Sequence, residues 1–152
     1  MEIKEITLLS VAEYQSCKNV IPQKDTTWFL RDAYREKPGA GYADWVGVVN
    51  SQDHILNGVL HDINAVAPAL VLDTTRLHPG DKVEFAGHKW TVIAEDMIFM
   101  DDYLEDMEFD NNPDAIIADY MSSSVRAYLE NWLNAHKDEP MYLVKDGEAR
   151  IL

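Results

Sequence analysis

The densest group of side chains able to do chemistry is a run of carboxylates between residues 95 and 119. Ten Asp or Glu residues fall in this stretch, and no Lys or Arg interrupts them. Carboxylate oxygens at this density suit Ca²⁺ or Mg²⁺, and they equally suit the basic surface of another protein. The sequence therefore predicts an acidic interaction surface, for which the candidate residues are Asp101, Asp102, Glu105, Asp106 and Glu108.

One short pattern beside this surface resembles the start of an EF-hand calcium loop. Asp110, Asn112 and Asp114 carry oxygen-bearing side chains at alternate positions. The pattern then departs from a calcium loop, because Ala115 stands where the loop needs glycine and Met121 where it needs a bidentate glutamate. A Ca²⁺ ion on these three residues is one hypothesis, and a solvated acidic loop with no cofactor is the other.

Residues typical of hydrolases are present without a recognisable arrangement. The five histidines show neither His-x-x-x-His nor Glu-x-x-His spacing, and the chain has no Gly-x-Ser-x-Gly elbow. Cys17 is the only cysteine, and its position on a helical apolar pattern favours a small buried side chain over a reactive thiolate. The sequence thus names no catalytic residue, and an uncharacterised hydrolase is the third of three functional hypotheses.

The net charge limits the kinds of partner. The 152 residues include 27 Asp or Glu and 13 Lys or Arg, which gives a net charge of −14. Such a surface repels nucleic-acid phosphates and anionic membranes but attracts basic proteins, so we expect a protein partner. No apolar signal segment and no run of ~20 apolar residues is present, which favours a cytoplasmic location. Nothing in the pattern indicates an oligomeric state.

Two helices and a set of short strands must position these groups. Ser10 and Glu13 form a capping box before apolar residues at helical spacing, which predicts a helix over about residues 11–18. A second apolar stripe predicts a helix over 123–136. Strands are expected at 27–31, 45–49, 54–56, 66–72, 82–93 (a hairpin), 97–100 and 142–152 (a hairpin with an Asp-Gly turn), whereas 101–119 is expected to be irregular.

These elements predict one α+β domain over residues 1–152, with two helices on a mixed, mostly antiparallel sheet. An internal seam is expected at 73–80, where a turn interrupts the apolar pattern. The stretch 27–32, Thr-Trp-Phe-Leu-Arg-Asp, is expected at the centre of the fold. We expect residues 80–93 and the helix 123–136 to cover it from across the seam.

Parts of the chain resemble an uncharacterised domain family of gut bacteria, their phages and other mobile elements. Residues 28–31 are similar to the family's Trp-Trp-Leu-Arg-Ser strand, and residues 66–70 to its Val-Arg-Pro-Ala-Leu strand. Residues 80–92 match its Gly-Asp-x-Val-x-Phe-x-Gly-x-x-Trp-x-Val signature. The helix motif of the family is matched by Tyr120, Ser123, Arg126 and Leu129. In many relatives this second part comes first, so the chain resembles a circularly permuted member.

The resemblance implies a fold distantly similar to C-type-lectin-like and formylglycine-generating-enzyme-like domains, which present variable loops on an α/β scaffold. It brings no catalytic residue with it. Ala67 and Asp32 stand where the family has arginine and serine, which implies a rebuilt contact between these strands. We expect Arg31 to be partly buried and paired with Asp32, or with an acid from the second half of the chain.

The leading hypothesis is therefore a non-enzymatic binding domain of phage or mobile-element origin. Its function is expected in loops 32–44 and 101–119, which have turn chemistry and no core pattern. The alternative is an acidic inhibitor that mimics nucleic acid and blocks a host nucleic-acid-binding protein.

Overall fold

Trp28 and Phe29 are neighbours in one strand, and alternation along that strand sends their side chains into two different parts of the core. In the computed structural model, which describes residues 1–35 and 43–152, Phe29 lies in the larger hydrophobic cluster and Trp28 in the smaller one. Trp28 packs against Tyr14 and Phe99, with ring centroids 5.4 and 5.1 Å away. The stretch 27–32 is therefore central, as expected.

Two sheets, not one, form the framework of the described residues. The seven-stranded sheet has the order β1 (Ile3–Thr7), β6 (Ala69–Leu72), β9 (Met97–Met100), β8 (His88–Ala94), β7 (Lys82–Phe85), β11 (Met141–Lys145) and β12 (Glu148–Ile151). The five-stranded sheet has the order β10 (Glu105–Glu108), β5 (Ile63–Val66), β2 (Trp28–Phe29), β3 (Trp45–Val49) and β4 (Ile55–Val59). Among the pairings of described strands only β2 with β5 is parallel.

The expected single strand over residues 66–72 is wrong. β5 ends at Val66 and β6 begins at Ala69, and the two strands belong to different sheets. Pro68 has no N–H to contribute to a ladder, while its carbonyl accepts a hydrogen bond from Met100 N at 3.0 Å. The chain therefore uses residues 67–68 to cross from one sheet to the other, which the apolar composition alone does not reveal.

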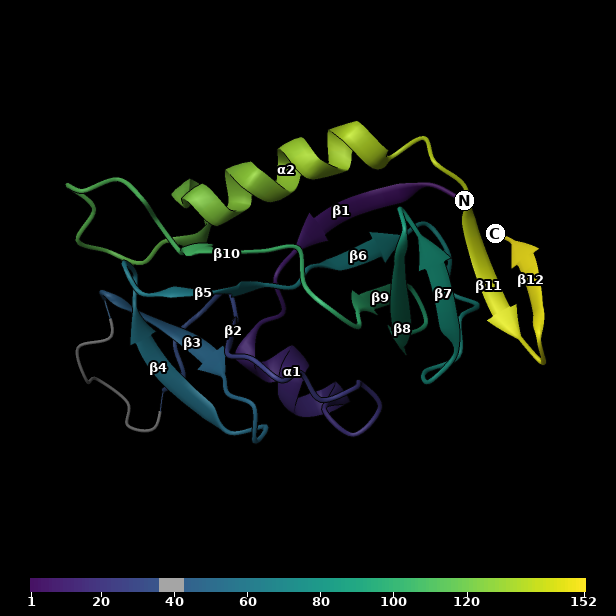
Figure 1. The fold of residues 1–152 in the computed structure, drawn as a ribbon, viewed down its shortest axis with the longest axis horizontal. Helices are drawn as coiled ribbons and strands as arrows, with labels where there is room; N and C mark the ends of the chain where they lie inside the picture. Colours follow the sequence, from purple (N-terminus) through teal and green to yellow (C-terminus); the bar gives the residue numbers. More distant parts are fainter. Residues whose placement is uncertain (36–42) are drawn as a thin grey trace.

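Both helices lie where the sequence predicts them. α1 (Val11–Cys17) begins with the expected capping box, in which Ser10 Oγ accepts from Glu13 N and Glu13 Oε1 accepts from Ser10 N. α2 (Ser124–His136) is capped by Ser123 and follows a short 3₁₀ helix, η1 (Tyr120–Ser122). The two helices lie on opposite sides of the sheets in Figure 1, with α2 running alongside β1.

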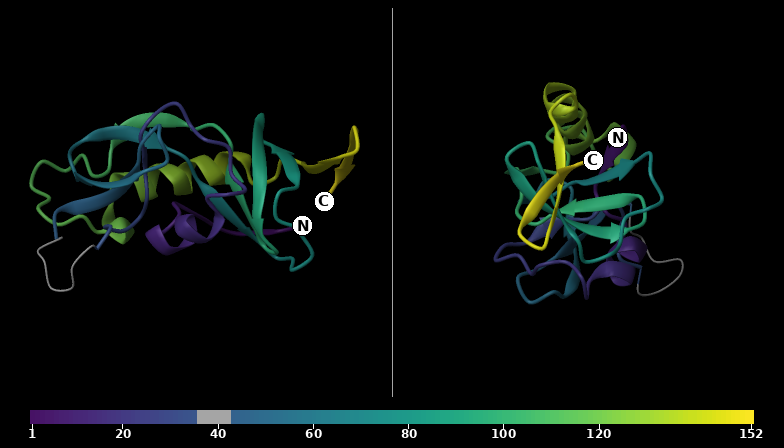
Figure 2. Two further views of the ribbon diagram at one scale, coloured as in Figure 1. Left: turned by 90° about the horizontal axis from the view of Figure 1, so that it is seen from below. Right: turned by 90° about the vertical axis from the view of Figure 1, so that its right-hand side faces the viewer.

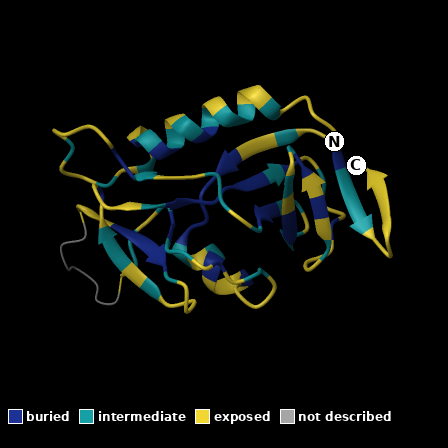
Figure 3. Cartoon of the chain, in the orientation of Figure 1, coloured by how far each residue is buried: buried dark blue, intermediate teal, exposed yellow. Residues whose placement is uncertain are grey.

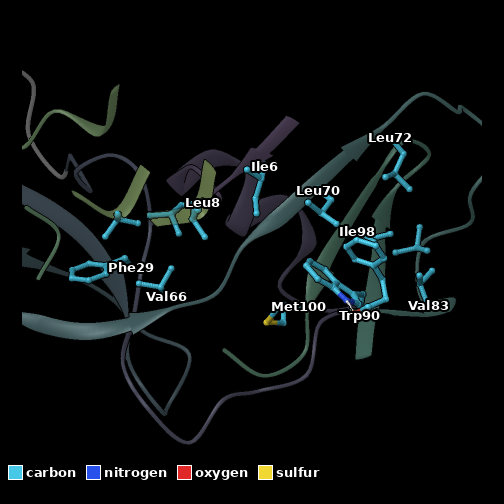
Figure 4. Close-up of a cluster of buried hydrophobic side chains, with 14 of the residues drawn as sticks. Ile6, Leu8, Phe29, Val66, Leu70, Leu72, Val83, Trp90, Ile98 and Met100 are labelled. Atoms are coloured by element: carbon cyan, nitrogen blue, oxygen red, sulfur yellow. Dashed lines mark hydrogen bonds between the residues drawn. The ribbon is translucent and has the colours of Figure 1, made fainter. Parts of the chain in front are cut away.

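The seam at 73–80 does not divide the core. The larger cluster joins Ile6, Leu8 and Phe29 to Val83 and Trp90, as the close-up in Figure 4 shows. Val125 and Leu129 of α2 also belong to this cluster, whereas the aromatic neighbour of Phe29 is Phe109, with ring centroids 5.6 Å apart; direct cover of Phe29 by residues 80–93 and α2 stays a prediction. Trp28 is covered by α1 and β9 instead. The chain thus folds as a single α+β domain, with its buried residues along the middle in Figure 3.

Candidate functional site

The described parts of two loops that the sequence singled out meet at one end of the smaller sheet. Ala118 N donates to Ala43 O at 2.7 Å, which joins the segment around residues 116–121 to the one before β3. Between them lies a groove of about 430 Å³. It is lined by Arg31, Asp32, Ala33, Arg35, Ala43, Trp45, Ile117, Ala118, Asp119, Tyr120 and Met121. Residues 36–42 of the first predicted loop lie outside the described residues.

The groove gathers exposed apolar side chains. Trp45, Ile117 and Met121 line it with exposed fractions of 41%, 58% and 64%. Val59 is the cross-strand partner of Trp45, and Ile116 precedes Ile117 in the chain; both are exposed as well. These are five of the ten exposed large apolar side chains among the described residues. Apolar groups concentrated on one face of a domain indicate an interaction site, unlike apolar groups scattered singly.

A glycine allows the first loop to leave the sheet beside β3. Gly47 N donates to Asp32 O at 2.7 Å, and Gly47 O accepts from Leu30 N at 2.8 Å. A Cβ atom on Gly47 would lie only 2.6 Å from Asp32 O, closer than real Cβ contacts come. The absence of a side chain at this position therefore sets how closely the groove wall approaches β3.

Arg31 is paired with an acid, but not with the expected one. Its guanidinium forms an ion pair with Glu13 of α1 and donates to Leu8 O at 2.8 Å, with about a third of the side chain exposed. Asp32 accepts instead from Val11 N, at the first turn of α1. The predicted Arg31–Asp32 pair is wrong, because the Arg31 guanidinium is held by Glu13 and Leu8 O while the Asp32 carboxylate is held by Val11 N. Both residues still connect the groove wall to α1.

Tyr120 lies at the base of the groove with its hydroxyl turned into the protein. Its Oη atom is buried and meets no described group at good hydrogen-bond geometry, although Thr7 and the Leu8 backbone lie near enough to act on its pKa. Burial raises the pKa of the Tyr120 phenol. The ring packs on Phe109 of the main core, with centroids 6.4 Å apart, so Tyr120 anchors the 116–121 segment through apolar contact.

The predicted acidic surface divides into two parts. Asp101 accepts from Thr91 Oγ1 and lies 3.2 Å from Lys82 Nζ, and Asp102 lies 3.1 Å from His88 Nδ1. Basic groups that are distant in sequence thus accompany these two carboxylates. The remaining three, Glu105, Asp106 and Glu108, form β10 at the edge of the smaller sheet. The expectation that residues 101–119 are irregular throughout is therefore wrong, since pairing with β5 orders four of them.

A buried lysine beside this surface was missed by sequence analysis. Lys24 Nζ donates to Met100 O and to Asp101 O, both at 2.7 Å, and lies 4.5 Å from the centre of the Phe99 ring. Burial lowers the pKa of the Lys24 ammonium to about 8. No local pattern marks this residue, because its partners lie more than 70 positions later in the chain.

The calcium-like pattern has a structural use. Asp110 Oδ1 accepts from Asn112 N, and Asn112 Oδ1 accepts from Asp114 N, each at 3.1 Å. These are consecutive Asx turns, a use of alternate Asp and Asn residues that requires no ion. Among the described residues no group of three His, Cys, Asp or Glu side chains is placed to hold a metal. The calcium hypothesis gains no support from this geometry.

The histidines are only partly dispersed. His88 and His136 both lie beside Trp132, with ring centroids 6.4 and 4.6 Å away, and His136 is paired with Glu139. A recess of about 380 Å³ at the β7–β8 turn is lined by His88, Glu84 and Glu139 among others. A histidine and carboxylates thus converge, which keeps the hydrolase hypothesis open. No Ser, Thr or Cys is among the residues lining this recess.

No family model, curated protein or solved structure matches the chain. The resemblance to a mobile-element family and to C-type-lectin-like folds consequently stays a prediction. In the described part of the chain no helix has the length and apolar character needed to cross a membrane.

Proposed function

We propose that this protein is a non-enzymatic binding domain that docks a segment of a partner protein in the groove between residues 31–35, 43–45 and 116–121. The observation that carries the proposal is that three of the ten exposed large apolar side chains of the described residues line this groove, and that two more, Val59 and Ile116, adjoin lining residues. All four charged residues of the groove already interact within the chain, so its apolar side chains are the principal recognition surface; the four are Arg31, Asp32, Arg35 and Asp119.

The proposed occupant is a segment with apolar side chains flanked by Lys or Arg. The apolar side chains pack against Trp45, Ile117 and Met121, where burial of apolar surface supplies the affinity. The net charge of −14 selects basic flanks, because a field of this sign accelerates encounter with cationic partners and repels acidic ones. In this proposal the chain acts in the cytoplasm of a host cell and derives from a phage or mobile element.

Capture from host lysate at two salt concentrations tests the proposal, with two variants as the decisive comparison. The doubly substituted I117D/M121D protein places charge in the groove, so it should lose a captured basic protein. The matched control is I63D, which places charge on an exposed apolar residue outside the groove lining and should retain capture. Retention by I117D/M121D, or no specific capture by the unsubstituted protein, contradicts the proposal.

The alternative function is an acidic inhibitor of a nucleic-acid-binding protein, and β10 is the observation that favours it. Asp106 and Glu108 stand two residues apart on one face of an edge strand, which spaces their Cα atoms by roughly 7 Å. Affinity of such an inhibitor should fall steeply as salt rises, because the contacts are ionic. The affinity should also fall in the D106N/E108Q variant and stay unchanged in the I117D/M121D variant. Capture that is insensitive to salt excludes this alternative.

A further inference from the structure

The two sheets of the described residues have four edges, and three of them are protected. β1 contains a bulge between Ile3 and Glu5 and lies against α2. β10 presents three carboxylates in four residues, so two copies of it repel each other. On β4, the Val59 amide is already bonded to Asp62 Oδ2 at 3.0 Å and the Asn57 side chain holds the Tyr34 backbone, so two of its five residues are engaged by neighbouring segments. The fourth edge, β12, is exposed at every residue and projects at one end of the molecule in Figures 1 to 3.

The β11–β12 hairpin determines which backbone groups of β12 face outward. Asp146 and Gly147 form a two-residue turn with φ of 54° and 78°, so the flanking pair Lys145–Glu148 is hydrogen-bonded. Hydrogen-bonded and non-bonded pairs then alternate along the ladder, in agreement with the bond from Leu152 N to Met141 O at 2.9 Å. Ala149 therefore directs its N–H and C=O away from β11, as does Ile151.

This alternation limits the registers in which β12 can pair with β12 of a second copy. An antiparallel pair about a two-fold axis must set outward-facing residues opposite each other, which leaves Ala149 opposite Ala149, Ala149 opposite Ile151, or Ile151 opposite Ile151. With Ala149 opposite Ile151, Arg150 lies directly opposite Arg150 of the other copy. With Ile151 opposite Ile151, Glu148 has no residue opposite it. With Ala149 opposite Ala149, each Glu148 lies opposite the other copy's Arg150. These two pairs occupy non-hydrogen-bonded positions of the ladder, where side chains lie closest.

The charge around β12 differs from that of the rest of the chain. A recess of about 240 Å³ beside the hairpin is lined by Arg76, Lys145 and Arg150, with Asp81 and Glu148 as its only carboxylates. With Asp146 of the adjoining turn included, three Lys or Arg face three acids, a balance that contrasts with 13 against 27 for the whole sequence. Two copies that meet at this end therefore avoid the repulsion that a net charge of −14 imposes elsewhere.

We propose that β12 pairs with β12 of a second copy of this chain, antiparallel and with Ala149 opposite Ala149, so that the seven-stranded sheets of two copies join edge to edge. Two backbone hydrogen bonds between the alanines and two Glu148–Arg150 pairs hold the contact. A strand of four residues gives an interface of the small, transient class, so association is expected at high protein concentration.

Charge reversal tests the register by sedimentation equilibrium. E148R sets like charges opposite each other at both pairs, and so does R150E, so each variant alone should dimerise about tenfold more weakly or worse. The E148R/R150E double variant restores both pairs and should dimerise like the unsubstituted chain. Mixing the E148R and R150E proteins should give a heterodimer. The E148R chain then has positive side chains at positions 148 and 150, and the R150E chain has negative side chains at both.

Two further variants separate the edge contact from folding and from total charge. A149P removes the outward N–H of Ala149, which takes no part in the β11 ladder, so the protein should stay folded by circular dichroism and lose dimerisation. R126E makes the same charge change as R150E on α2, and should leave dimerisation unchanged. A monomer at all concentrations overturns the proposal. So does dimerisation that survives A149P, or E148R and R150E proteins that fail to associate when mixed.

Discussion

The Lys24 ammonium lies 4.5 Å from the centre of the Phe99 ring and donates to the carbonyls that end β9. Burial opposes its charge and lowers its pKa from 10.5 to about 8. Cation–π attraction and two hydrogen bonds offset part of that cost. The pair thus couples the position of the 22–27 segment to the protonation state of one amine.

The first prediction concerns the pH dependence of stability. Between about pH 8 and 10.5 the unfolded chain keeps the Lys24 proton and the folded chain has lost it, so this group makes the free energy of unfolding rise with pH. Below pH 8 both states hold the proton and the contribution is flat. Denaturant titrations should therefore show that the unsubstituted protein gains stability relative to K24M across this window, by up to roughly 3 kcal/mol.

The comparison with K24M is essential because two other groups act in the opposite direction. Burial raises the pKa of the Cys17 thiol from 9.0 to about 11, and that of the Tyr14 phenol from 10.0 to about 12. The folded state then binds more protons than the unfolded state, so these groups lower stability as pH rises through the same range. A difference between the two proteins that is constant from pH 8 to 10 would contradict the assignment to Lys24.

The second prediction concerns the reactivity of Cys17. Its thiol is buried in the smaller core cluster, and burial raises its pKa to about 11, so little thiolate exists at neutral pH. Modification by a thiol-specific disulfide reagent should be slow in the native protein and fast in denaturant. Native and unfolded rates that agree at pH 7 would show that Cys17 is accessible and would remove the core assignment.

The sequence predicts the features of this fold that depend on neighbouring residues, and it does not predict those that depend on distant ones. α1 and α2 are located to within a residue or so, because capping and apolar periodicity are local. The break at Pro68 between two sheets is not predictable locally, because residues 66–72 are uniformly apolar. Whether such a run forms one strand or two depends on which partners the rest of the chain supplies.

The candidate site is also predictable only in part, because local patterns mark its segments and do not show which segments meet. The absence of a core pattern marks both loops, but nothing in the sequence indicates that Ala118 bonds to Ala43. Arg31 is likewise marked as partly buried, whereas its partner Glu13 belongs to a helix 18 residues earlier. Pairing between elements depends on the packed geometry, and residue types do not determine it.

The third prediction concerns Tyr120. Its buried hydroxyl has no partner at good hydrogen-bond geometry and only a weak interaction with Thr7 and the Leu8 backbone, so Y120F removes a poorly satisfied polar group and keeps the ring contact with Phe109. The free energy of unfolding should stay the same or rise by about 1 kcal/mol. S123A serves as a control in the same segment, because it removes the N-cap of α2 and should cost about 1 kcal/mol. A loss of stability in Y120F would reveal a partner for the hydroxyl.

The last prediction concerns Gly47, which sets the approach of the groove wall to β3. In G47A the new methyl group would meet Asp32 O at 2.6 Å, and this backbone oxygen cannot move without disturbing its bond to Gly47 N. Denaturant unfolding should show a loss of about 1–3 kcal/mol, typical of overpacking. G58A on the neighbouring strand is the matched control, because its closest contact is the Asp62 side chain at 3.1 Å, which can shift at the cost of at most its exposed hydrogen bond from Val59 N. Equal losses in the two variants would mean that strand propensity, and not the contact with Asp32, determines the need for glycine at position 47.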